Sequence, residues 1–165
     1  MKINGSILAV SIGAAYAVTS VYSAQAEEAA SSAYISPSEE AVSAMVDLPQ
    51  GEPIHALSLV RFNARAEYPS GITFAAEDWT GAEAFEAYRS GIKPIVRRLG
   101  GGSIYSGDAL LTLVGPEHEN WDAVFIIYYP NASAMAEMSQ DPDYQKNALH
   151  RAASLADSRL ILVAE

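Results

Sequence analysis

The pattern of apolar and polar positions is clearest in the last third of the chain. Residues 121–129 are rich in aromatic and β-branched side chains and are closed by Pro130, which predicts a strand. Residues 159–164 predict a second strand, which ends the chain. Between the two we expect helical sequence, because polar capping residues occur there twice.

Two helix starts account for the segment between these strands. Asn131 is placed to cap the first helix. The second begins at Asp141, whose side chain can cap it while Pro142 occupies the first helical position, and we expect it to run to about Ala156. The last third therefore predicts the order strand, helix, helix, strand.

Residues 54–62 form another long apolar run. Both of its alternating faces are apolar, which is typical of a strand buried on two sides, so we expect it at the centre of a sheet. Residues 63–78 have no regular periodicity and predict a loop, with a turn at 69–71 and a short extended piece at 72–75.

A long amphipathic helix is predicted after this loop. Thr80 and Glu83 have the spacing of a capping box, and apolar residues follow at helical spacing. Pro94 is expected to kink this helix near Gly91. The three glycines at 100–102 are expected to end it.

Residues 103–114 predict a strand, with a bulge at 106–108. The whole order is then β-α-β-β-α-β, the ferredoxin-like α+β arrangement, in which two helices cover one face of an antiparallel sheet. The strands are nevertheless apolar on both faces. We therefore expect the second face to pack against another copy, giving a homodimeric α+β barrel that can enclose a small-molecule ligand.

The first 26 residues have the features of an export signal. Lys2 provides a positive start, residues 7–21 are mainly apolar, and Ala24-Gln25-Ala26 has the small residues of a cleavage site. We expect cleavage after Ala26, an exported protein that is periplasmic or secreted, and no membrane contact afterwards. The alternative is an uncleaved membrane anchor.

The segment after the signal predicts a tether and a short helix. Residues 27–35 are rich in Ala, Ser and Glu, which is typical of a flexible segment. Ser36 and Glu39 have the spacing of a capping box around Pro37, so we expect a helix that packs its apolar side on the domain. Residues 36–165 are accordingly expected to form one domain.

The amino-acid composition argues against several kinds of partner and reactive site. The chain of 165 residues has a net charge of −10, and an acidic surface repels phosphates, so we expect no nucleic-acid partner. It contains no cysteine, which excludes disulfides, thiolate nucleophiles and iron–sulfur clusters. Its three histidines, His55, His118 and His150, have no ligand motif around them. We therefore expect neither a metal ion nor a cofactor.

A set of short motifs is spread over about residues 45–165. These motifs are Leu57-Ser58-Leu59-Val60-Arg61-Phe62, Gly100-Gly101-Gly102, Val114-Gly115-Pro116, Trp121-Asp122, Tyr129-Pro130, Asp141-Pro142-Asp143-Tyr144-Gln145, His150-Arg151 and Ala156-Asp157-Ser158-Arg159-Leu160-Ile161. Together they resemble an uncharacterised bacterial domain-of-unknown-function family of the dimeric α+β barrel superfamily. The resemblance implies a ferredoxin-like protomer and a homodimer. It places the chain near cofactor-free monooxygenases, ether-degradation accessory proteins and small-molecule isomerases, and it implies no catalytic residues.

Two candidate ligand-binding residues lie on predicted strands. Arg61 stands among apolar neighbours, where an unpaired charge is costly. We expect it either to pair with a carboxylate such as Glu119 or Asp122, or to face a cavity that binds an anionic or carbonyl ligand. Tyr128 and Tyr129 point to opposite faces of their strand, so one of them is expected to face the dimer cavity.

Three further candidates lie on the second helical segment of the last third. Tyr144 and Arg151 fall on one stripe of that helix and could present a hydroxyl and a guanidinium to one pocket. The alternative is that Tyr144 packs and Arg151 forms a surface ion pair. His150 is expected to point away from this stripe, toward solvent or an interface, which does not favour a general-base role.

The sequence leaves three functions open. The first is a binding or accessory protein whose barrel holds a small apolar or aromatic ligand. The second is a cofactor-free enzyme, similar to a monooxygenase or an isomerase, in which Tyr144, Arg151 and Arg61 orient a small carbonyl or aromatic compound. The third is a structural dimer with a filled core.

Overall fold

A four-stranded antiparallel sheet organises the residues that the computed structural model describes, 33–72 and 78–164. The strands are β1 (Ile54–Phe62), β2 (Gly102–Asp108), β3 (Ala123–Tyr129) and β4 (Leu155–Ala164), in the spatial order β2-β3-β1-β4. The helices are α2 (Glu39–Ala44), the 3₁₀ helix η1 (Met45–Asp47), α3 (Gly81–Arg98), α4 (Ala132–Gln140) and α5 (Pro142–Ser154). This is the ferredoxin-like arrangement that the sequence predicts, and the prediction is confirmed.

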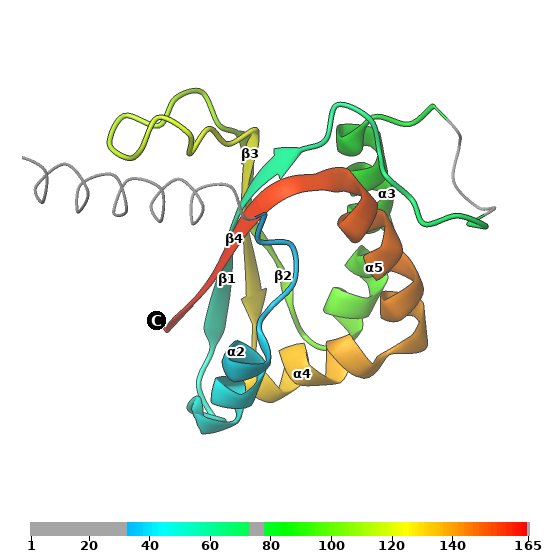
Figure 1. Ribbon diagram of the computed structural model, residues 1–165. Helices are drawn as coiled ribbons and strands as arrows, with labels where there is room; N and C mark the ends of the chain where they lie inside the picture. Colours follow the sequence, from blue (N-terminus) through cyan, green and yellow to red (C-terminus); the bar gives the residue numbers. More distant parts are fainter. Residues whose placement is uncertain (1–32, 73–77, 165) are drawn as a thin grey trace, which may run out of the picture. The chain divides into compact units, whose positions relative to one another are not determined.

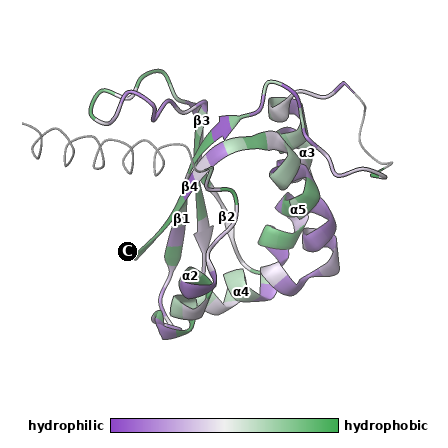
Figure 2. Ribbon diagram, in the orientation of Figure 1, coloured by the Kyte–Doolittle hydropathy of each residue, from purple (hydrophilic) through white to green (hydrophobic). Residues whose placement is uncertain are grey.

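The helices α3, α4 and α5 lie on one side of this sheet (Figure 1). The hydrophobic core lies between them and the sheet, and its largest members include Phe85, Tyr88, Phe125 and Tyr129. In Figure 2 the strands β1 and β4 contain long hydrophobic stretches, whereas α3 and α5 alternate between hydrophobic and hydrophilic residues. The helices therefore bury one stripe each, while the strands present apolar side chains to both faces of the sheet.

The strand β1 has the predicted bounds and the predicted central position. It pairs with β3 on one side and with β4 on the other. Ile54, Ala56 and Val60 are buried against the helices, which places the alternate residues of β1 on the opposite face. This alternation decides which candidate side chains can meet.

The predicted caps of the three longer helices are present. The Thr80 hydroxyl accepts a hydrogen bond from the Glu83 N–H (3.2 Å), and the Glu83 carboxylate accepts one from the Thr80 N–H (2.8 Å). The Asn131 side chain caps α4 and the Asp141 side chain caps α5. The helix α3 continues without interruption through Pro94, so the kink stays a prediction.

The bounds of the strands β2 and β3 differ from the predicted ones. The strand β2 ends at Asp108, six residues early, because after the hydrogen bond from the Ala109 N–H to the Asp122 carbonyl (2.9 Å) the chain leaves the sheet. The register shift of β2 lies between Ser103 and Tyr105, rather than at 106–108. The strand β3 begins at Ala123, two residues later than predicted.

The junction of α5 and β4 also differs from the prediction. The helix ends at Ser154 and the strand starts at Leu155, four residues early, so no loop separates them. Leu155 pairs with Phe62, and the register then shifts to align Asp157 with Arg61. The extra strand residues exist because β1 is long enough to pair with them, which no local pattern indicates.

The segment before β1 packs differently than expected. The short helix α2 is capped by Ser38 rather than Ser36, and neither α2 nor η1 contains a buried residue. The expectation that this helix packs its apolar side on the domain is therefore wrong. Ile35 and Leu48, which flank the helical residues, contact the core instead.

The end of the predicted tether is attached to β4. The Tyr34 N–H donates to Asp157 Oδ1 (2.9 Å), the Tyr34 carbonyl accepts from the Ser158 hydroxyl, and the Ile35 carbonyl accepts from Arg151. The domain therefore includes Tyr34 and Ile35 rather than beginning at Ser36. The predicted export signal, the rest of the tether and most of the extended piece at 72–75 lie outside the described residues.

Candidate functional site

One face of the sheet carries no helix within residues 33–72 and 78–164 (Figure 1). Its side chains come from alternate positions of all four strands, opposite to those that face the core. We call the following residues the open face: His55, Leu57, Leu59, Tyr105, Val124, Ile126, Tyr128, Ile161 and Val163. Apart from one imidazole and two hydroxyl groups, this surface is apolar.

Much of this apolar surface is exposed. Tyr105 and Ile161 are 53% and 49% exposed, although both lie within regular strands. The β2–β3 loop adds four side chains that are each more than three-quarters exposed, namely Leu110, Leu111, Leu113 and Val114. Contiguous exposed apolar surface on a folded domain marks an interaction site.

Tyr128 is the tyrosine that faces away from the core. Tyr129 is buried against the helices, so the alternation of β3 places Tyr128 on the open face. Its ring contacts the His55 ring edge to face, with centroids 5.7 Å apart. The two residues are also aligned in the register of β1 and β3. Together they place a phenol and an imidazole side by side within the apolar surface.

Arg61 lies at one end of the open face and is paired, as expected, but with a different partner. Its Nη2 atom is 3.8 Å from Asp157 Oδ2, and its Nη1 donates to the His118 carbonyl (3.1 Å). Glu119 and Asp122, the expected partners, are used elsewhere. Arg61 therefore forms part of a charged cluster rather than facing a cavity as a lone cation.

Asp157 is the centre of this charged cluster. Its carboxylate accepts hydrogen bonds from the Tyr34 N–H, the Ser158 N–H and Arg159 Nη1, each 2.9 Å long. Burial raises the pKa of this carboxyl, but the backbone hydrogen bonds and Arg159 outweigh it, so the pKa lies below its usual value. Asp157 was not among the predicted site residues, because the predicted strand begins only at residue 159.

Arg159 links the cluster to two aromatic rings. Its guanidinium lies 4.7 Å from the Tyr34 ring centroid and 5.1 Å from that of Trp121. Its Nη2 also pairs with Glu119 Oε1 at 3.2 Å. A guanidinium enclosed by two rings and two carboxylates is held in one orientation, so the charged end of the open face is rigid.

Replacing Asp157 by Asn is expected to destabilise the domain by about 1–3 kcal/mol at pH 7, because Arg61 and Arg159 lose their shared carboxylate. A carboxyl whose pKa is lowered by folding stabilises the protein above its unfolded pKa of about 4, and this contribution disappears as the pH falls further. Urea unfolding should therefore separate variant and parent at pH 7 much more than at pH 3.

The matched control for this experiment is Asp143→Asn, which removes an exposed carboxylate from a surface ion pair with Lys146. It should leave the unfolding midpoint unchanged. An Asp157→Asn protein as stable as the parent at pH 7 would contradict the role of the charged cluster.

Tyr144 and Arg151 lie in the helical layer, on the other side of the sheet. Both are close to the buried Tyr88, and burial, with a hydrogen bond to Tyr144, raises the pKa of the Tyr88 phenol. The Arg151 guanidinium donates to the Ile35 carbonyl and to Ser158 Oγ. The shared stripe was predicted correctly, but Arg151 binds groups of the protein, and neither residue faces the open face.

His150 is half-buried rather than fully exposed to solvent, and the alternative expectation, an interface, stays a prediction. Its Nδ1 lies 2.7 Å from the Tyr68 hydroxyl, and its ring also contacts the Trp79 ring at a centroid distance of 5.7 Å. Burial lowers the pKa of the imidazole and raises that of the Tyr68 phenol, so both groups are neutral near pH 7. The loop before α3 covers this histidine, which helical phase alone could not show.

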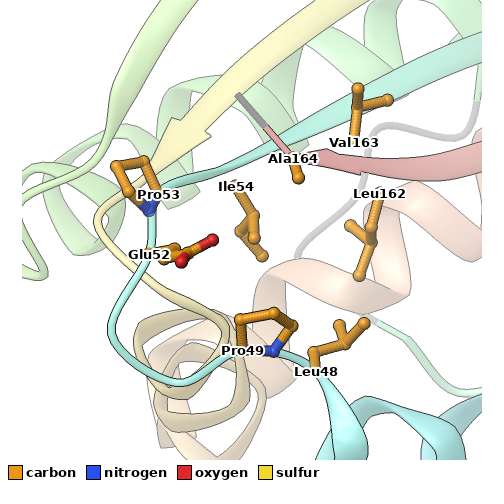
Figure 3. A pocket seen from close by; sticks show the side chains of 8 residues that line it. All are labelled: Leu48, Pro49, Glu52, Pro53, Ile54, Leu162, Val163 and Ala164. Atoms are coloured by element: carbon orange, nitrogen blue, oxygen red, sulfur yellow. The ribbon is translucent and has the colours of Figure 1, made fainter.

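Two pockets are found on the described part of the structure. The smaller one, at the ends of β1 and β4, has a volume of about 50 Å³. Figure 3 shows Leu48 and Leu162 pointing toward each other across it, with the Glu52 carboxylate nearby. Ligand sites usually exceed about 300 Å³, so this hollow is a packing defect. The larger one, about 550 Å³, lies between α3 and β2.

Within the described part of the chain, no helix is long and apolar enough to cross a membrane. In the same residues, no group of three histidine, aspartate or glutamate side chains is arranged to hold a metal ion.

The candidate ligand-binding residues are divided between the two sides of the sheet. Tyr128 belongs to the open face and Arg61 lies at its charged end, whereas Tyr144, His150 and Arg151 belong to the helical layer.

Comparisons with known proteins identify relatives. The model of a family described as a domain of unknown function, DUF1330, matches residues 71–165. The RPA0582 protein of unknown function from Rhodopseudomonas palustris is similar in two crystal structures, one of the methylated protein. The identities are 41% and 40%, with TM-scores of 0.74 and 0.73. The matches cover 81% of this chain and 95% and 98% of that chain.

A more distant match has low sequence identity. It is a dimeric protein of unknown function with a ferredoxin-like fold from Bacteroides fragilis, with 8% identity and a TM-score of 0.43. The match covers 71% of this chain and 100% of that chain. No protein among those with curated descriptions matches the sequence.

Proposed function

Since the chain belongs to the DUF1330 family, we propose that it is an exported, homodimeric binding protein. The open faces of two copies pack on each other and enclose a small apolar or aromatic ligand. The export rests on the first 26 residues, and the dimer and the ligand site rest on the open face.

The observation that carries the proposal is the exposed apolar surface of the open face. Four strands of seven to ten residues span roughly 500 Å² of flat sheet at the usual strand spacing. A specific interface buries about 800 Å² per partner. The flat area of the open face is smaller than this, and the exposed loop at 110–114 offers further apolar side chains. A self-complementary apolar patch is what a two-fold dimer needs.

Charge does not prevent this association, although each chain carries a net charge of −10. The charged groups near the open face lie together at one end of it. There the positive charges of Arg61 and Arg159 are balanced by the negative charges of Asp157 and Glu119. The centre of the face is uncharged. Two copies can therefore approach through surfaces that add no net repulsion.

The ligand is expected beside Tyr128 and His55. Two packed sheets lie about 10 Å apart. Side chains fill the space between them except where a residue has a small side chain or none. On this face β2 contributes Gly102, which is aligned with Tyr128 and adds no side chain, and an added Cβ there would have no neighbour within 4 Å. The proposal is for binding rather than turnover, because the candidate polar groups are divided between the two sides of the sheet.

Native mass spectrometry of the full chain, purified from its own host, tests this function. The expected result is twice the protomer mass together with a retained small molecule that is released on denaturation. A monomer over the whole range from about 1 to 100 μM would overturn the dimer. A dimer from which denaturation releases no small molecule would overturn the ligand site.

A further inference from the structure

A groove between α3 and the edge strand β2 lies on the helical side of the sheet, away from the open face (Figure 1). Its volume of about 550 Å³ falls within the range of small-molecule sites. Ile92 and Val96 of α3 and Ile127 of β3 line its apolar part. The groove is therefore large enough to hold a small organic molecule, and one of its walls is apolar.

The groove stays open because the start of β2 has almost no side chains. At Gly101, a Cβ atom would lie 2.6 Å from the Tyr128 carbonyl oxygen and 2.9 Å from Val96 Cγ1, so only glycine fits there. Gly102, which also lines the groove, adds no side chain. Ser103, the next residue on this wall, is small and exposed. The start of β2 therefore contributes no large side chain to the groove.

Three basic side chains line the same groove. Arg89, Lys93 and Arg97 follow each other at every fourth residue, about 6 Å apart along the helix axis. Residues 89–98 hold four of the ten Lys and Arg residues of a chain whose net charge is −10. The only acidic residue that lines the groove, Glu86, pairs with Arg89 at 3.2 Å.

The three cations differ in how they are held. Arg89 is fixed by Glu86, by Ser106 Oγ (3.2 Å) and by the Phe125 ring, whose centroid is 4.5 Å away. Lys93 and Arg97 form no ion pair with any described residue. The helix dipole favours a cation in the last turn, which explains Arg97 but not Lys93.

We propose that this groove binds a small monocarboxylate with an apolar body, one molecule per chain. The carboxylate is held by Lys93 and Arg97, and the apolar part lies against Ile92, Val96 and Ile127. The site is independent of the proposed dimer, because it lies on the opposite side of the sheet. Aliphatic and aromatic acids share this chemistry, and the probes below distinguish them.

The test is an amide ¹⁵N NMR titration of the full chain with sodium octanoate as the aliphatic probe and sodium 2-naphthoate as the aromatic probe. At least one should shift amide signals along α3 and at the start of β2, with one site per chain. Octanamide lacks the charge, and inorganic phosphate lacks the apolar body. Each should bind roughly tenfold or more weakly than the better acid.

Two variants examine the two halves of the site. The double variant Lys93→Gln/Arg97→Gln removes both unpaired cations and should weaken binding at least about tenfold. Ser103→Trp keeps every charge but fills the groove, and should abolish binding. The matched control is Lys146→Gln on α5, where the lysine is 74% exposed and distant in sequence from the groove. It should bind like the parent.

Several results would overturn the proposal. These are signals that shift only on the open-face strands, octanamide binding as tightly as octanoate, or no shift with either acid at about 10 mM. Unchanged affinity in the double variant would also overturn it, and this variant changes only exposed side chains, so it should fold. The dimer mass is measured separately, which keeps the outcomes for the two proposed sites distinct.

Discussion

Replacing Leu57 by Glu is expected to convert the dimer into a monomer. Leu57 lies in the middle of β1 on the open face, aligned with Ile126 of β3 and Ile161 of β4. In the proposed dimer the substitution places a carboxylate from each copy in an apolar interface without a cationic partner. We expect the dissociation constant of the dimer to rise more than about 1,000-fold, or roughly 4 kcal/mol.

Light scattering coupled to size-exclusion chromatography, over a series of protein concentrations, measures this change. The control is Ala82→Glu, which adds the same charge at an exposed position near the start of α3, on the helical side of the sheet. It should leave the dimer intact. If the Leu57→Glu protein remains as dimeric as the control, the open face is not the dimer interface.

Gly81→Ala is expected to destabilise the domain by about 3 kcal/mol, the upper end of the usual range for overpacking. Gly81 is buried at the first position of α3, where its N–H donates to the Asn63 carbonyl (3.0 Å). An added Cβ would lie 2.4 Å from the Asn63 oxygen and 2.5 Å from the Ser154 oxygen. Both contacts are with backbone, which cannot move aside as a side chain can.

The position matters because three elements meet there. The Asn63 N–H donates to the Ser154 carbonyl (2.8 Å), and the Asn63 side chain donates to the carbonyls of Ala153 (3.1 Å) and Leu155 (3.3 Å). These bonds join the end of β1 to the junction of α5 and β4. A displaced α3 would therefore disturb the pairing of the two strands as well as the helix start.

Urea unfolding at one fixed protein concentration measures this effect, since the stability of a dimer depends on concentration. The matched control is Gly51→Ala, where an added Cβ has no neighbour within 4 Å. The control should be neutral or slightly more stable than the parent. A Gly81→Ala protein that unfolds at the same urea concentration as the control would show that the backbone relaxes at little cost.

Local sequence patterns predicted most of the fold because they act over a few residues. The capping pairs at Thr80 and Asp141 and the bounds of β1 depend on neighbours along the chain, and all were confirmed. The apolar residues 110–114 were predicted as a strand, but an apolar run becomes a strand only where a partner is available. These residues leave the sheet after Ala109 and have no partner strand.

The candidate site was predicted less well, since its contacts join distant segments. Arg61 was expected to be paired, but its carboxylate, Asp157, could not be identified without the register of β1 and β4. Helical phase placed Tyr144 and Arg151 on one stripe, yet it could not show that Tyr68 and Trp79 cover His150. The basic stripe on α3 was visible in the sequence, whereas the groove beside it was not.

By itself, the sequence determined the order of the elements, the caps of α3, α4 and α5 and the apolar character of both sheet faces, because hydrogen bonds within a turn and the period of a strand are local properties. Only the tertiary structure decided which charged and aromatic groups meet. The Tyr34 N–H and the Asp157 carboxylate that binds it are 123 positions apart. Such pairs depend on strand register and on how the helices pack, and both are settled only when the whole chain folds.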